Sequence, residues 1–209
     1  ALACLSNKIR LAAGEGDLDF DGIGKVELKS AVSSTGGRIG YGGGSQKAKT
    51  QALQKYAEQI PTVMATLKNN AAGSLGFNKF IPPLVQDLPL NDNESKQLRG
   101  AIIKDLITMD LENFAGPVID AFIRTDDPVA IEEAYLRANF AWYKNRDDFD
   151  ALMLCSFANE KFAMIKNDND LIAFTKSGHA QSRAISMIPS QAGAGREQWA
   201  QLTLNKSKM

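Results

Sequence analysis

Four acidic side chains near the start of the chain have the types and spacing of a metal-binding loop. The stretch from Asp17 to Glu27 reads D-L-D-F-D-G-I-G-K-V-E. Carboxylate oxygens at alternate positions, a glycine that permits a sharp turn and a closing glutamate are the features with which a protein loop surrounds Ca²⁺. The sequence therefore predicts a calcium site, the one cofactor site that it suggests, with four candidate ligands: Asp17, Asp19, Asp21 and Glu27.

The same stretch departs from the EF-hand calcium loop in two ways. Glu27 falls at position 11 of the loop, whereas the bidentate glutamate of an EF-hand stands at about position 12. Gly14 and Gly16 also interrupt the segment that would have to form the preceding helix. A surface turn rich in aspartate and glycine explains the same residues without a metal ion, so both interpretations stay open.

Groups suited to acid–base or nucleophilic catalysis are few. His179 is the only histidine, so a catalytic triad or a Cys-His pair would have to use it. Two carboxylates can also act as general acid and base. The acidic residues of the central block, however, stand where helix caps and solvated faces are expected: Glu132, Glu133, Asp147, Asp148 and Asp150. We therefore expect a non-enzymatic protein and assign no catalytic residue.

Three large aromatic residues are candidates for contact with a partner protein. Trp142 and Tyr143 are adjacent, so on a helix their side chains point in different directions and one of them can face outward. Trp199 lies in the basic C-terminal segment. Aromatic residues at helical spacing are more often part of a core than of a pigment or lipid pocket, and this core interpretation stands beside the predicted partner contacts.

Apolar periodicity predicts an all-α fold. Residues 46–69 and 92–124 repeat apolar side chains at steps of three and four, with breaks at Pro61 and Pro117. The block 126–166 continues this spacing from Ile131 through Phe149 and beyond, which predicts one long helix or two helices with a corner. We expect an up-down helical bundle of about four to five core helices, with extended N- and C-terminal arms.

Signals outside the core helices are short. A short helix is predicted at 1–12, a connector at 77–91, a helix capped by Asp170 at 171–176 and a last helix at 196–204. Lys25 to Lys29 is the one stretch that alternates like a β-strand.

Charge separates a central body from two arms. Residues 92–170 carry nine basic and sixteen acidic residues, and residues 171–209 carry five basic and one acidic, although the net charge of the whole chain is zero. We predict an N-terminal arm at 1–44 with the Asp/Gly-rich loop, a helical bundle domain at 45–177 and a C-terminal arm at 178–209. Opposite charges favour contact of the arms with an acidic body, either their own or a neighbour's.

The two cysteines form no metal or redox motif. Cys4 and Cys155 are far apart in the chain and neither belongs to a C-x-x-C sequence. Cys155 stands among apolar residues, where a buried thiol is expected, and a disulfide between the two is left open. The chain begins at Ala1 without methionine, which suggests processing and is compatible with export or organelle import. No apolar run reaches the length of a membrane span.

These patterns favour a non-enzymatic subunit of a larger assembly, for example an extrinsic subunit of a membrane complex, that docks through its terminal arms. The expected partners are other protein subunits, because long arms with few apolar anchors bury little area on their own body. Nucleic acid is not expected, since the net charge is zero and the basic tail lacks interleaved aromatic residues. The alternatives are a calcium-binding module that uses the Asp17–Glu27 loop and, second, an enzyme with carboxylate acid/base residues.

Overall fold

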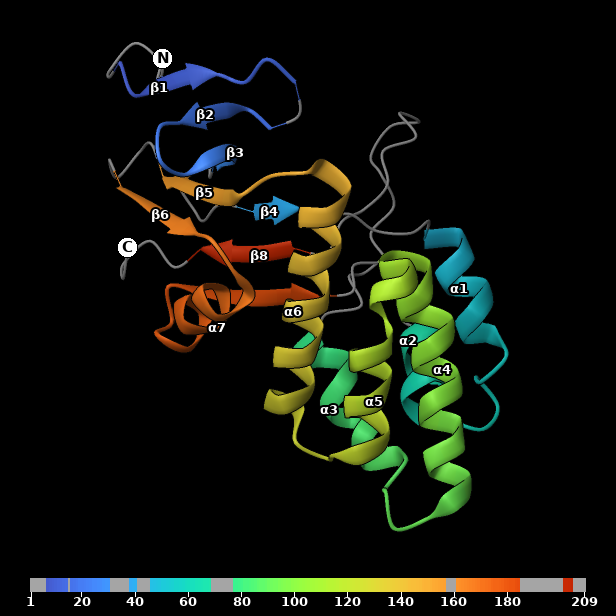
Figure 1. Ribbon diagram of the computed structural model, residues 1–209. Coiled ribbons are helices and arrows are strands. Elements are labelled where there is room, and N and C mark those ends of the chain that lie inside the picture. The colour runs from blue at the N-terminus through green and yellow to red at the C-terminus, as the bar shows by residue number, and fades with distance from the viewer. Residues whose placement is uncertain are drawn as a thin grey trace. The chain divides into compact units, whose positions relative to one another are not determined.

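The computed structural model describes residues 7–14, 16–30, 38–40, 46–68, 77–156, 161–184 and 201–204. The chain divides into two compact units. The sheet unit comprises residues 1–39, 140–181 and 202–209, and the helical unit comprises residues 40–139 and 182–201. Figure 1 shows the elements of both units in chain order. The domain boundaries that the sequence places after residues 44 and 177 stay predictions.

Prolines and polar caps set the ends of helices in the helical unit. Its elements are α1 (Gln46–Gln54), α2 (Pro61–Lys68), α3 (Phe77–Asp87), α4 (Asn93–Leu111), the 3-10 turn η2 (Glu112–Phe114) and α5 (Gly116–Arg124). Pro61 begins α2, because a proline at the first helical position lacks only an N–H that the helix does not use. The Asp92 side chain accepts hydrogen bonds from the Glu94 and Ser95 amides and so begins α4. The predicted break at Pro61 and the new helix start at Pro117 are confirmed.

A buried arginine joins three segments of the helical unit. Arg99 of α4 is 0% exposed. Its guanidinium donates to the carbonyl oxygen of Val85 at 2.8 Å and to those of Phe122 and Thr125 at 3.1 Å, and it forms an ion pair with Asp126. Carbonyl groups in the last turn of a helix lack an intrahelical donor, so Arg99 satisfies acceptors that would otherwise be buried and unpaired.

Helix α6 (Pro128–Asp147) runs from the helical unit into the sheet unit. Pro128 is its first residue, and the Asp127 side chain accepts a hydrogen bond of 2.9 Å from the Val129 amide. The helix ends at Asp147, and Asp148 follows with a positive φ of 42°. Neither α6 nor any other helix in the described ranges is long and apolar enough to cross a membrane.

The sheet unit contains a five-stranded mixed sheet. Its strands lie in the order β1 (Ile9–Leu11), β2 (Leu18–Phe20), β3 (Gly24–Ser30), β5 (Ala151–Ser156) and β6 (Lys161–Ile165), as Figure 1 shows. β3 and β5 are parallel, and the other neighbours are antiparallel. A second sheet has the order β4 (Arg38–Gly40), β8 (Gln201–Leu204) and β7 (Ala180–Ala184).

The pairing register assigns side chains of the five-stranded sheet to two faces. Residues directly opposite one another on paired strands share a face, and neighbours along a strand point to opposite faces. Glu27 is paired with Leu152, so these two residues share one face. The other face carries a buried apolar cluster: Leu18, Val26, Ala151, Met153 and Cys155.

The predicted all-α helical bundle is wrong, because the five-stranded sheet together with helices α1 to α7 makes an α/β fold. The main error lies in the block 126–166. Residues 151–155 of β5 are all buried, so this strand reads as a continuous apolar run without alternation. Such a run cannot be distinguished from a buried helix by periodicity alone, although α6 in fact ends at Asp147 and two strands follow it.

The shorter predictions have mixed outcomes. The strand at Lys25 to Lys29 is confirmed by β3, and the helix at 171–176 is confirmed by α7 (Asp168–Lys176). The cap predicted at Asp170 is wrong, because Asn167 is the N-cap and Asp170 is the third helical residue, whose side chain accepts from the Asn167 amide. The helix predicted at 1–12 is wrong where β1 forms, and the one at 196–204 is wrong where β8 forms. The connector predicted at 77–91 is mostly helix α3, which continues through Pro82 and Pro83.

Candidate functional site

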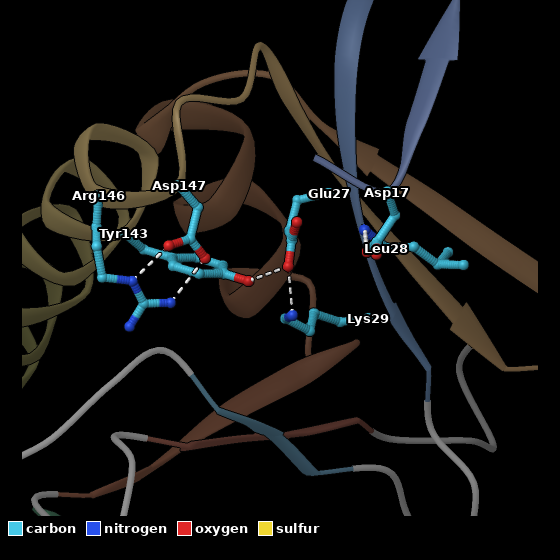
Figure 2. A network of polar contacts seen from close by, with 7 residues as sticks. All are labelled: Asp17, Glu27, Leu28, Lys29, Tyr143, Arg146 and Asp147. Atoms are coloured by element: carbon cyan, nitrogen blue, oxygen red, sulfur yellow. Dashed lines mark hydrogen bonds and ion pairs between the residues drawn. The ribbon is translucent and has the colours of Figure 1, made fainter. Parts of the chain in front are cut away.

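A buried carboxylate on β3 is held by a tyrosine from α6. The Tyr143 hydroxyl donates a hydrogen bond of 2.7 Å to Glu27 Oε1, and the Lys29 ammonium donates to the same oxygen. All three residues belong to the sheet unit. Figure 2 shows both donors converging on one oxygen of Glu27. Glu27 is only 8% exposed, so these bonds take the place of water around a charged group.

Strand and helix periodicity bring these residues together. Glu27 and Lys29 are two positions apart on β3 and therefore share a face of the sheet. Tyr143 lies near the end of α6, where its ring meets the edge of Phe149 with centroids 5.0 Å apart. Phe140, one turn earlier on the helix, packs against the same phenylalanine at 6.1 Å. This aromatic packing fixes the direction in which the Tyr143 hydroxyl points.

A second charged pair ends α6 beside this network. Arg146 Nε and Nη2 donate to Asp147 Oδ1 and Oδ2 at 2.5 and 2.7 Å. The guanidinium carbon of Arg146 lies 4.7 Å from the centre of the Trp142 ring and 5.0 Å from that of Tyr143, within the range of cation–π attraction. The hydrogen bonds from Arg146 to Asp147 raise the pKa of the guanidinium, so Arg146 remains a cation.

These groups border a pocket of about 250 Å³ in the sheet unit. Its lining residues come from the turn before β2, from β3 and from the end of α6: Gly16, Asp17, Glu27, Arg146 and Asp147. Asp17 Oδ2 accepts a hydrogen bond of 2.8 Å from the Leu28 amide, which fixes the side chain beside β3. Gly16 has a φ of 83°, a conformation that favours glycine, and so lets the chain turn next to Asp17.

Two groups of the site, Tyr143 and Arg146, keep their protons near neutral pH. Burial, and then the hydrogen bond to Glu27, raise the pKa of Tyr143 well above its ordinary value, so its hydroxyl stays a neutral donor. On the other face of the sheet, burial raises the pKa of the Cys155 thiol. A general acid or base works best with a pKa near the working pH, and a nucleophilic cysteine needs a lowered one. Neither Tyr143 nor Cys155 therefore has the pKa that proton transfer or covalent catalysis would need.

The structure brings together two of the four predicted calcium ligands. Asp17 and Glu27 line the same pocket. Asp19 lies within β2, and Asp21 forms an ion pair with Arg10. Within the described ranges, no three His, Cys, Asp or Glu side chains are placed to hold a metal ion. The calcium site stays a prediction.

The aromatic residues predicted to bind partners differ in exposure. Tyr143 is buried and Trp142 is half-buried, whereas Trp199 lies outside the described residues, and their assignment to partner contacts stays a prediction. His179, the residue on which a histidine mechanism would depend, stacks on Phe174 with ring centroids 5.2 Å apart and contacts Ser177 Oγ through Nδ1.

Sequence reasoning did not single out Lys29 or Arg146, and it assigned Asp147 only to a helix cap. Two local signals were present. The alternation in residues 25–29 places Glu27 and Lys29 on one face of a strand, and Arg146 and Asp147 follow Tyr143 by three and four positions, the spacing of neighbours on a helix. The meeting of Glu27 with Tyr143 joins residues 116 positions apart, and no local pattern contains it.

The chain has no match among the family models, the curated proteins or the solved structures with which it was compared. A function for the chain is therefore inferred from the geometry of the pocket.

Proposed function

We propose that the protein binds a small charged molecule in the pocket beside Glu27 and does not transform it. The observation that carries this proposal is a pocket of about 250 Å³ bordered by Asp17, Glu27, Arg146 and Asp147. This volume suits a ligand the size of several water molecules, each of which takes about 30 Å³ in the liquid. A few charged side chains converging on a pocket give a ligand its orientation and specificity.

The charge states of the site support binding over catalysis. Tyr143 keeps its proton and Arg146 keeps its charge, because the pKa of each is raised. The described lining residues of the pocket include neither a histidine nor a cysteine. Tyr143 and Arg146 therefore offer a ligand a fixed hydrogen-bond donor and a fixed positive charge, which is what recognition requires, and neither is poised for proton transfer.

Trp142 makes the proposal testable in solution. The Arg146 guanidinium borders the pocket and lies 4.7 Å from the Trp142 ring centre, so a ligand that moves Arg146 changes the fluorescence of Trp142. The chain has two tryptophans, and the variant Trp199→Phe leaves Trp142 as the reporter. Propylammonium, acetate and Ca²⁺ are each titrated into this variant, and each probe is analysed afterwards for chemical change.

We expect a saturable fluorescence change with at least one probe, recovery of that probe unaltered, and loss of the response in Glu27→Gln. Asp105→Asn is the matched control, because Asp105 also accepts from a tyrosine and a lysine, Tyr56 at 2.9 Å and Lys55 at 3.0 Å, but does not line the pocket. Circular dichroism verifies that the variants fold. If Glu27→Gln does not fold, Asp17→Asn, at an exposed lining residue, takes its place. The proposal is contradicted if none of the probes gives a saturable response or if a probe is chemically converted. It is also contradicted if the pocket variant and the control lose the response equally.

The assembly subunit that the sequence favours is a second candidate function, supported by two exposed apolar side chains. Leu11 on β1 and Phe162 on β6 are 74% and 67% exposed and stand on the two outer strands of the five-stranded sheet. Outer strands offer backbone groups to a strand of another protein, so we propose a partner subunit that adds a strand bearing apolar side chains.

Gel filtration tests this second candidate in extracts of the source organism. The chain should elute at a larger mass in the extract than when purified, and Phe162→Ser should abolish the difference. Val129→Ser, at an α6 residue that is 57% exposed, should leave it unchanged. Elution of the wild-type chain at its own mass in the extract contradicts the subunit function.

A further inference from the structure

We infer that the charged group received by the pocket is a primary ammonium, held between Asp17 and Glu27. This inference rests on the binding function proposed above and names the chemical class of the ligand. A free alkylamine and a lysine side chain of a partner protein both present this group, and the experiment below separates these two sources.

Ion pairing within the site leaves one negative charge uncompensated. Arg146 neutralises Asp147 through two hydrogen bonds, and Lys29 neutralises Glu27. Asp17 lines the same pocket, and among the described residues its carboxylate has the Leu28 amide as a partner but no cation. One positive charge therefore completes the balance of the site, whereas an anionic ligand would add a second uncompensated charge beside Asp17.

The carboxylates of Asp17 and Glu27 each accept hydrogen bonds on only one of their two oxygens within the described part of the chain. A carboxylate accepts on both oxygens, but Tyr143 and Lys29 both donate to Glu27 Oε1, and the Leu28 amide donates to Asp17 Oδ2. Within the described part of the chain, no donor reaches Glu27 Oε2 or Asp17 Oδ1. Asp17 is exposed, and Glu27 Oε2 is not one of the buried polar atoms that lack a partner in the described residues, so both oxygens are open to a ligand in the pocket. These two open acceptors suit a ligand that carries N–H donors as well as a positive charge.

A primary ammonium suits these two oxygens better than other cations do. It is a compact charge with three N–H donors, and it can donate to one oxygen of each of two carboxylates. A guanidinium is planar and best matched to both oxygens of a single carboxylate, and Asp17 and Glu27 each have one oxygen already used. Ca²⁺ takes about six to eight oxygen ligands, and the described residues supply no group of three.

Two aspartates four positions apart provide the test. Asp17 borders the pocket, whereas Asp21 pairs with Arg10 and is not a lining residue. In the Trp199→Phe background, Asp17→Asn and Asp21→Asn are compared for propylammonium binding by fluorescence and calorimetry. Tetramethylammonium, which has the same charge but no N–H donor, is the second probe. The N-acetyl methylamide of lysine is the third and represents a lysine of a partner protein.

We expect Asp17→Asn to weaken propylammonium binding about tenfold or more, as the loss of a hydrogen bond between charged groups implies. Asp21→Asn should leave the affinity unchanged, and tetramethylammonium should bind about tenfold more weakly than propylammonium. Tighter binding of the lysine derivative supports a partner's lysine as the source, and tighter binding of propylammonium supports a free amine.

Two results overturn the inference in distinguishable ways. If acetate binds, or if tetramethylammonium binds as tightly as propylammonium, the pocket binds a ligand but the ammonium assignment is wrong. If neither an ammonium nor any other probe binds, the binding function fails together with the assignment.

Discussion

Removing the Tyr143 hydroxyl tests the interaction on which the geometry of the site depends. In Tyr143→Phe the ring and its edge-on contact with Phe149 are kept, and the 2.7 Å hydrogen bond to Glu27 Oε1 is lost. A hydrogen bond to a charged group contributes about 1.5–3 kcal/mol to the free energy of unfolding. We expect a loss in this range, because Tyr143 is 0% exposed and Glu27 is 8% exposed. Lys29 still pairs with Glu27, so the loss stays below that of an isolated buried charge.

Thermal unfolding followed by circular dichroism measures this loss. Each kcal/mol lowers the melting temperature of a chain of this size by about 2–4 °C, so Tyr143→Phe should melt about 3–12 °C below the parent. Tyr56→Phe is the control. Tyr56 also donates to a carboxylate, Asp105, at 2.9 Å, but it is only half-buried, so its substitution should cost less stability. Equal melting temperatures for Tyr143→Phe and the parent, or equal losses in the two variants, would refute the role assigned to the Tyr143 hydroxyl.

Other perturbations test the fold around the site. Arg99→Met should lower the free energy of unfolding in urea by about 3–5 kcal/mol, because it leaves buried helix-end carbonyls without their donor. Arg124→Met, at a 75% exposed arginine, should lower it by less than about 1 kcal/mol. Equal losses in the two variants would contradict the role of Arg99 as the donor to these carbonyls. Gly24→Ala should lower the melting temperature, because its Cβ would lie 2.1 Å from Asp150 Oδ2 and φ at this position is 99°. Gly14→Ala should leave the melting temperature unchanged, because its Cβ would meet no atom within 4 Å. Similar melting temperatures for the two variants would count against the geometry at Gly24. The pKa of Tyr143 is raised above 10 in the folded protein, so the contribution of its hydroxyl to stability is complete below pH 10 and declines as the pH rises further. Wild type should therefore lose more stability than Tyr143→Phe between pH 9 and pH 11. Parallel pH profiles of the two proteins would contradict the raised pKa.

Several helix starts depend on single residues, and the sequence predicts those at Pro61 and Pro117. Pro61 and Pro117 stand at the beginnings of α2 and α5, and Pro128 begins α6. The side chain of Asp92 caps α4. Each signal acts within about one turn of helix, so the residues nearby contain the whole cause.

The strands depend on partners far away in the chain, and this is why most of them escaped prediction. β5 pairs in parallel with β3, with Val26 opposite Ala151, and burial on both of its faces removes the alternation that marks a strand. β1 is only three residues long, too short for a periodic pattern. β3 was identified because its charged residues alternate with apolar ones, and the same alternation places Glu27 and Lys29 on one face.

Part of the candidate site was predictable because two of its residues belong to one short stretch of the sequence. The composition of the Asp17–Glu27 stretch drew attention to both residues, and both line the pocket. The calcium-loop spacing, however, grouped them with Asp21, which pairs with Arg10. The contribution of α6 depends on the approach of a helix to a strand more than 100 positions earlier in the chain.

One nuclear magnetic resonance titration tests the central claim most directly, because two backbone amides donate to aspartates in the same way. The Leu28 amide donates to Asp17 Oδ2 at 2.8 Å beside the pocket, and the Thr62 amide donates to Asp87 Oδ2 at 2.7 Å in the helical unit. Addition of propylammonium should move the Leu28 amide resonance along a saturable curve and leave the Thr62 resonance in place. If the Leu28 resonance does not move, or if both move in proportion to concentration without saturating, the pocket beside Glu27 is not an ammonium-binding site.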